Sequence, residues 1–108
     1  MSAEYRHIGI PVLHKKPNMM FNEWGKFWVS EDVNAHDYVV EYLKFEEETQ
    51  FPDILQKVPH VAFTVDDAEP YIRDADRVII GPLFRKEGVH ITFIMKDDVL
   101  IELYEDKR

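Results

Sequence analysis

The sequence predicts an α+β fold built from two related halves. Apolar and polar residues alternate along several short segments, as they do in half-buried strands. Helical signals are short and stand between these segments, at residues 52–57 and 66–76. A strand pattern that begins with histidine occurs twice, at residues 7–12 and 60–65. Because 108 residues is the usual length of one domain, we expect a single domain over residues 1–108.

The composition narrows the class of protein. Apolar residues make up 45% and charged residues 31%, which is typical of globular domains. The net charge of −8 argues against a nucleic-acid partner, since no basic surface is available to bind phosphates. The absence of cysteine excludes disulfides and thiolate chemistry. No apolar run is long enough for a membrane span or a signal peptide, so we expect a cytoplasmic protein without a membrane partner.

The first half is expected to contain three strands and an irregular segment. Residues 5–13 (YRHIGIPVL) alternate as a strand, and Pro11 ends it or places it at a sheet edge because proline has no N–H donor. Between Pro17 and Gly25 the sequence allows a short helix, with a loop or a short strand as the alternative. Two further strands are predicted at residues 26–30 and 36–45, joined by a turn at 31–35.

The second half reads β-α-β-β-β. Residues 60–65 (HVAFTV) alternate as a strand, and residues 66–76 open with acidic residues, which favour a helix N-terminus. The next strand, residues 77–88, is expected to break at Gly81-Pro82. Residues 89–106 predict a hairpin whose turn is Lys96-Asp97-Asp98.

Two features recur in the same order in both halves. The segment HIGIPV matches HVAFTV, and VVEYLKF matches LIELYED, which places Glu41 against Glu102. His7 precedes Glu41 by 34 residues, whereas His60 precedes Glu102 by 42. The first half is therefore shortened, and the missing residues fall where its helix is expected. Repeats of this kind usually mark two supersecondary units that share one core.

This order of a histidine strand, a helix, further strands and a glutamate strand, given twice, resembles the vicinal oxygen chelate superfamily of glyoxalases, bleomycin-resistance proteins and extradiol dioxygenases. The resemblance is strongest in HVAFTVDDAEPYI and GVHITFIMKDDVLIELYE and weakest at residues 13–35. It implies two βαβββ modules, at about residues 1–50 and 58–106, whose mixed β-sheet forms a cup, with a reduced or missing helix in the first module. It also implies metal ligands at His7, Glu41, His60 and Glu102.

The residues themselves agree with such a site. In both histidine strands the histidine faces away from the richer apolar side, and Glu102 interrupts the otherwise apolar run VLIELY. A buried carboxylate is stable only when it is paired or bound to a metal. Two imidazoles and two carboxylates suit Zn²⁺, Ni²⁺, Co²⁺, Mn²⁺ or Fe²⁺, with positions left open for water or substrate.

Three functions are compatible with these features. The first is a metal-dependent lyase or isomerase that binds a small oxygen-rich metabolite in the cup, with Glu41 and Glu102 as catalytic proton carriers. The second is a metal-free protein of the bleomycin-resistance type that binds or sequesters a small molecule. The third is a structural homodimer without a ligand, and we expect a homodimer in all three cases because an open sheet leaves exposed edges.

Each candidate residue also has a simpler interpretation. His7 and His60 can hydrogen-bond to backbone at strand starts, Glu102 can pair with Arg73 or Arg85, and Glu41 can be a solvated residue beside Lys44. His90, Thr92 and Trp28 are weaker candidates for substrate binding, with packing as the alternative for His90 and for the aromatic group Trp24, Phe27 and Trp28. These alternatives stay open at the level of sequence.

Overall fold

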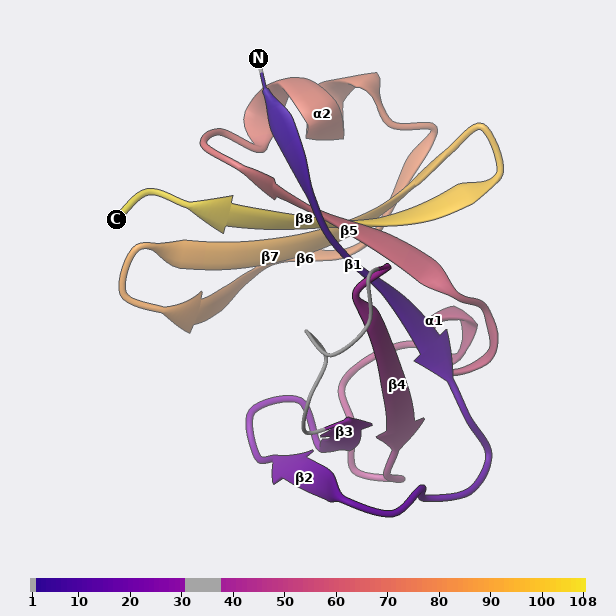
Figure 1. The fold of residues 1–108 in the computed structure, drawn as a ribbon. Helices are drawn as coiled ribbons and strands as arrows, with labels where there is room; N and C mark the ends of the chain where they lie inside the picture. The colour runs from indigo at the N-terminus through magenta and orange to yellow at the C-terminus, as the bar shows by residue number, and fades with distance from the viewer. Residues whose placement is uncertain (1, 31–37) are drawn as a thin grey trace. The chain divides into compact units, whose positions relative to one another are not determined.

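The computed structural model describes residues 2–30 and 38–108 and divides the chain into two compact units. Residues 2–6 with His60–Arg108 form one unit, here called the C-terminal unit, and His7–Pro59 form the N-terminal unit. Strand β1 contributes to both units. The described residues hold these elements (Figure 1): β1 Ala3–Pro11, β2 Met19–Asn22, β3 Phe27–Ser30, β4 Val40–Phe45, α1 Asp53–Lys57, β5 His60–Val65, α2 Glu69–Asp74, β6 Arg77–Lys86, β7 Val89–Lys96 and β8 Val99–Asp106.

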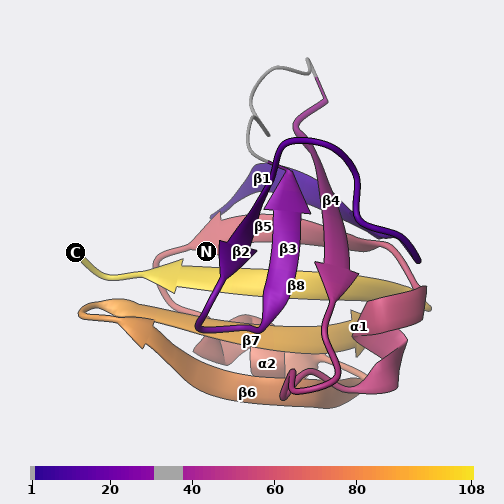
Figure 2. The same cartoon turned by 90° about the horizontal axis from the view of Figure 1, so that it is seen from below.

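The C-terminal unit is a mixed sheet with the strand order β1-β5-β8-β7-β6. Strand β5 runs parallel to β8, and β7 is antiparallel to both β8 and β6. Figure 2 shows β5, β8, β7 and β6 one beside the next. The order β5, α2, β6, β7, β8 along the chain confirms the predicted β-α-β-β-β pattern and the α+β class.

Helix α2 covers one face of this sheet. Glu69 lies in its first turn with a proline beside it, and Arg73 lies in its last turn, so the charges match the helix dipole. Against the sheet it forms a core of Val65, Ala68, Ile94 and Leu103, with Tyr71, Ile72, Ala75 and Ile101 packed around it. The carboxylate of Glu105 accepts a hydrogen bond from the Ala68 N–H at 2.8 Å, which fixes the start of the helix to β8.

Strand β6 differs from the sequence prediction. The break expected at Gly81-Pro82 does not occur, and β6 continues from Arg77 to Lys86. Its pairing with β7 shifts register at several points along its length, so β-bulges absorb the irregularity. Gly81 has a φ of +115° and lies so close to β7 that a Cβ atom would meet the Ile91 carbonyl oxygen at 2.7 Å. Glycine is therefore the residue that lets the strand continue there.

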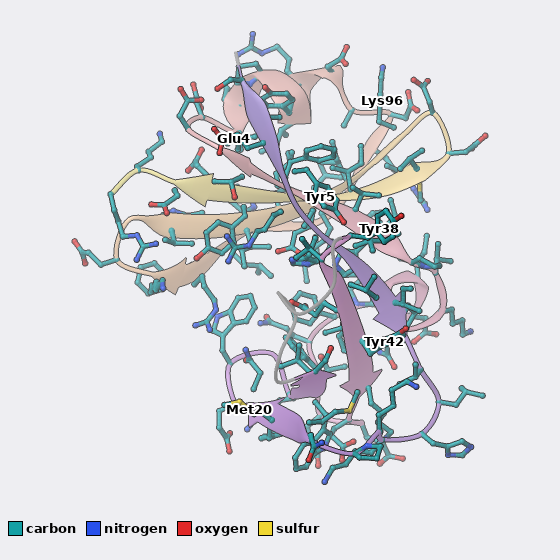
Figure 3. The ribbon with its side chains drawn as sticks, viewed as in Figure 1. Glu4, Tyr5, Met20, Tyr38, Tyr42 and Lys96 are labelled. Carbon is teal, nitrogen blue, oxygen red and sulfur yellow. The ribbon has the colours of Figure 1, made fainter. Side chains whose placement is uncertain are left out.

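The turn between β7 and β8 has two residues rather than the three predicted. Lys96 pairs with Val99, so only Asp97 and Asp98 lie in the turn. Both have positive φ, 51° and 65°, as in a type I′ turn. The turn is held by hydrogen bonds to the end of α2, where Lys96 donates to the Asp74 carbonyl oxygen and Asp97 N–H donates to the Asp76 carboxylate (Figure 3 labels Lys96).

Replacing Asp98 by glycine is expected to stabilise this hairpin. Glycine adopts positive φ without steric cost, so Asp98→Gly should raise the free energy of unfolding by roughly 0.5–1 kcal/mol. Urea unfolding followed by circular dichroism measures the change. The same replacement at Asp67, which lacks a positive φ and whose carboxylate accepts the Glu69 N–H, should lower stability instead. Equal effects at both positions would contradict the turn assignment.

The N-terminal unit has the strand order β2-β3-β4-β1, with β1 and β4 parallel and β2, β3 and β4 antiparallel (Figure 2). The short helix considered between Pro17 and Gly25 is absent, and strand β2 occupies that place. No helix lies between β1 and β2, where residues 12–18 are all described, so the predicted missing helix of the first module is confirmed. The predicted turn at 31–35 and the start of the strand at 36–37 lie outside the described residues.

Aromatic side chains pack together in this unit, and Phe27 and Phe45 lie on the face of its sheet that carries Glu41. Phe27, Phe45 and Phe51 have ring centroids 5.4–6.2 Å apart, and Trp24 meets Phe51 edge-on. Helix α1, predicted at residues 52–57, places the fully buried Leu55 in the same unit. Trp24 and Phe27 are half-buried and pack against other aromatic rings, which agrees with the packing interpretation of the aromatic group.

The two modules expected at about residues 1–50 and 58–106 stay a prediction; the compact units divide the chain after Arg6 and after Pro59. Within the described part of the chain, no helix is long and apolar enough to cross a membrane.

Two histidine–glutamate pairs as a candidate metal centre

The C-terminal unit holds a buried pair of His60 and Glu102. His60 is the first residue of β5, and its Nε2 lies 3.1 Å from Oε1 of Glu102 in β8. Both residues are buried, at 2% and 7% exposed. Strand pairing places them together, since Ala62 is the register partner of Glu102 and His60 lies two residues earlier on the same face. The His60 ring also meets Phe93 edge-on at 5.2 Å between centroids, which limits its rotation.

The N-terminal unit holds a second pair, His7 and Glu41. Nε2 of His7 in β1 lies 3.7 Å from Oε1 of Glu41 in β4. His7 is 6% exposed. Gly9 is the register partner of Glu41, and His7 again lies two residues earlier on the same face.

The two pairs are therefore built in the same way. Each lies on two parallel strands, and each glutamate has a small register partner, Gly9 or Ala62, two residues after the histidine. A small residue at this position leaves the space above the sheet to the two longer side chains. The repeat seen in the sequence thus reappears as one strand register used twice.

Solved structures provide an independent comparison. A hypothetical protein from Bacillus halodurans is 18% identical, with a TM-score of 0.60 over 100% of this chain and 97% of that one. The methylmalonyl-CoA epimerase from Mycobacterium tuberculosis is 19% identical, with a TM-score of 0.55 over 95% of this chain and 87% of that one. No protein family matches the sequence, and no curated protein is significantly similar to it.

The chain has the vicinal oxygen chelate fold.

At these identities the likeness shows the fold alone, and it confirms the resemblance predicted from the sequence. The imidazole nitrogens and carboxylate oxygens of the two pairs are atoms that could hold a divalent metal. His7, His60 and Glu102 are buried, and each unit supplies one imidazole nitrogen and one carboxylate oxygen in proximity. A buried carboxylate requires a compensating charge, which a bound cation provides.

Two of the cations considered beside the glutamates pair with other residues. Arg73, considered as a partner of Glu102, pairs with Glu69 on α2 at 3.2 Å. Lys44, considered beside Glu41, pairs with Glu46 at 2.9 Å. The positions of both glutamates are thus determined by the strand ladders and not by these cations.

The structure does not bring His90 and Thr92 to the face of Glu102. Their register partners on β8 are Glu105 and Leu103, and Leu103 packs under α2. His90 instead contacts Phe84, with ring centroids 5.8 Å apart, and its Nδ1 lies 3.9 Å from Glu105 Oε1. The cause is the length of the hairpin turn: a three-residue turn would set Thr92 opposite Glu102, whereas the observed two-residue turn sets Phe93 there.

Trp28 lies on the opposite face of its sheet from Glu41. Its register partner is Lys44, whereas Val29 pairs with Leu43 and so shares the face of Glu41. Trp28 contacts Phe21 at 5.1 Å between ring centroids, and Lys15 Nζ lies 3.7 Å from the Trp28 ring centroid. Trp28 also lines a pocket of about 370 Å³, together with Phe21, Lys26, Glu46 and Glu48.

Two residues near the C-terminal pair were missed by sequence reasoning. Phe93 contacts the His60 ring, and Arg6 lies over the ring of Tyr104, which shares the face of Glu102 as the alternation predicts. A two-residue turn at 97–98 identifies Phe93 from the sequence, since it fixes the register of the hairpin. Nothing in the sequence signals the contact of Arg6 with Tyr104, because these residues are far apart along the chain.

The carboxyl of Asp106 at the end of β8 should titrate at unusually low pH. Hydrogen bonds from the Arg108 side chain, at 2.9 and 3.0 Å, and from its backbone N–H lower the pKa of Asp106 to about 2. Carboxyl-detected NMR should therefore find a midpoint near 2, and Arg108→Gln should move it back toward the ordinary value of 3.8. Because the folded pKa is depressed, the interaction stabilises the fold above the unfolded pKa and is lost as pH falls through the folded pKa. The same midpoint in both proteins would contradict this.

Proposed function

We propose that the protein binds one divalent metal through His7, Glu41, His60 and Glu102 and acts as a lyase or isomerase on a small oxygen-rich metabolite. The observation that carries this proposal is the histidine–glutamate pair that occurs once in each unit in the same strand register, with His7, His60 and Glu102 buried and Glu41 half-buried. The vicinal oxygen chelate fold supports it, and one of the similar structures is of an epimerase, which is an isomerase.

The proposed roles follow from the chemistry of the donors. His7 and His60 supply neutral imidazole nitrogens, and Glu41 and Glu102 supply carboxylates, a set that suits Zn²⁺, Ni²⁺, Co²⁺, Mn²⁺ or Fe²⁺. When bound, such a metal would supply Lewis acidity to neighbouring substrate oxygens. Glu41 or Glu102 would move the proton between substrate carbon or oxygen atoms. Phe93, packed on His60, would hold that imidazole in its orientation and keep water away from it.

Metal analysis of protein purified without an affinity tag tests the proposal. We expect about one divalent metal per chain in the wild type and a loss of binding in His7→Ala and Glu102→Gln. His14→Ala and Glu87→Gln serve as matched controls, since both side chains are exposed and lie outside the pairs. The proposal is wrong if the wild type binds no divalent metal after incubation with each candidate ion, or if the site variants bind as the controls do.

A metal-free binding protein is the second candidate. The observation that favours it is the aromatic pocket of Phe21 and Trp28, which lies on the face of the N-terminal unit that no helix between β1 and β2 covers. In this case a small aromatic ligand would bind with unchanged affinity after treatment with a chelator, and Trp28→Ala would abolish binding while Glu102→Gln would not. Fluorescence of the tryptophans gives the readout.

We also propose that the protein is a cytoplasmic homodimer. Strands β2 and β6 are the terminal strands in the order of the sheet, and strand edges of this kind commonly pair or are covered in an assembly. Light scattering at micromolar concentration tests the dimer, and a monomer mass would exclude it.

A further inference from the structure

The face of the C-terminal unit that carries Glu102 continues past this residue to Tyr104. Tyr104 follows Glu102 by two residues on β8, so the two side chains share a face and lie about 7 Å apart along the strand. Tyr104 is 8% exposed and pairs in register with Thr64 of β5, which fixes its ring in the sheet. The ring therefore forms a rigid surface beside the proposed metal ligand.

Arg6 makes a cation–π contact with this surface. Its guanidinium carbon is 3.7 Å from the centroid of the Tyr104 ring. An aromatic ring occupies the face of a guanidinium and leaves its N–H groups, which point outward in the plane, available to an acceptor. Two of these N–H groups match the two oxygens of a carboxylate or phosphate.

Arg6 differs from Arg108 in its charged contacts within the described residues. Arg108 is already bound by Asp106, with side-chain hydrogen bonds of 2.9 and 3.0 Å. Arg6 is exposed, and among residues 2–30 and 38–108 it forms no ion pair. Within the described ranges, Arg6 is therefore held on an aromatic ring and not by a carboxylate.

We infer that Arg6 binds an oxyanion, a carboxylate or a phosphate group, of the molecule that this protein accepts. This inference rests on the proposed function, which places the reaction at the histidine–glutamate pairs. It adds the substrate class, which is an oxygen-rich metabolite with an anionic end. Tyr104 orients Arg6, and the anion would lie along β8 from Glu102, so the uncharged part of the metabolite reaches toward the histidine–glutamate pair.

An NMR titration of the full chain tests the inference. Succinate and inorganic phosphate are the probes, each added to the metal-free and to the zinc-loaded protein, and the Nε–Hε signal of Arg6 is followed. We expect a saturable shift of this signal with at least one probe. The probe with the lower dissociation constant shows whether a carboxylate or a phosphate is the preferred group. Arg6→Met should weaken binding at least tenfold, and Arg6→Lys should retain part of it.

Arg73→Met is the matched control, because Arg73 is exposed on α2 and pairs with Glu69 there. Its anion binding should equal that of the wild type. The inference is overturned if neither probe shifts the Arg6 signal, if Arg6→Met binds as the wild type does, or if Arg73→Met weakens binding equally. Arg6-dependent binding in the metal-free protein would support the inference even if no metal binds, so the two proposals can fail separately.

Discussion

Zinc at a thousandfold excess over its dissociation constant is expected to raise the free energy of unfolding by about 4 kcal/mol. The reason is that the folded chain holds two histidine–glutamate pairs in position, whereas the unfolded chain holds none. His60→Ala should remove most of this stabilisation, because it deletes an imidazole that lies 3.1 Å from Glu102. Thermal or urea unfolding with zinc, and then with an added chelator, measures the effect.

The number of bound ions distinguishes a shared site from two separate ones. If both pairs hold one ion, the wild type binds one zinc per chain, and His7→Ala and His60→Ala each weaken that same event. Two independent sites would instead give two zinc ions per chain, with one remaining in each variant. His90→Ala, which changes a histidine on the opposite face of the C-terminal sheet, should leave both number and affinity unchanged.

Leu103→Ala is expected to lower the free energy of unfolding by about 3 kcal/mol, within the usual range for a buried leucine. Leu103 is 2% exposed and packs with Val65, Ala68 and Ile94 under α2, so its removal leaves a cavity that the paired strands cannot close. Urea unfolding gives the value from the midpoint and an unchanged m-value.

Val99→Ala on the same strand is the control, since Val99 is 44% exposed and a cost below about 1 kcal/mol is expected. Similar losses at both positions would mean that the face under α2 is not the core of the C-terminal unit. A large loss at Leu103 together with unchanged zinc binding would show that the two faces of this sheet serve separate purposes, one for stability and one for the site.

The strands and both histidine–glutamate pairs were predictable because they depend on local alternation and on a repeat. Alternation along β5 and β8 decides which side chains share a face, and the repeat relates His7 to His60 without any structure. The N-terminal segment at residues 13–25 was not predictable, because its strand β2 is only four residues long and its order depends on aromatic contacts between distant residues such as Trp24 and Phe51.

The errors at His90, Thr92 and Gly81 have local physical causes. A turn with one residue too many exchanges the two faces of β7. The predicted three-residue turn therefore placed His90 and Thr92 on the face of Glu102, whereas they lie on the opposite face. Gly81-Pro82 reads as a strand break, yet β-bulges accommodate it, and bulges depend on the partner strand. Arg6 was missed because a cation–π contact between residues distant in sequence leaves no local pattern.

The use of one strand register for both pairs has a consequence for how such a chain can change over evolution. Histidine and glutamate are positioned by the hydrogen-bonded ladder of two adjacent parallel strands and by the small residue between them. The helix of a module takes no part in this placement, and the N-terminal unit keeps its pair although residues 12–18 form none. Helices and loops are therefore free to shorten or diverge, provided that Gly9 and Ala62 stay small and the ladders keep their register.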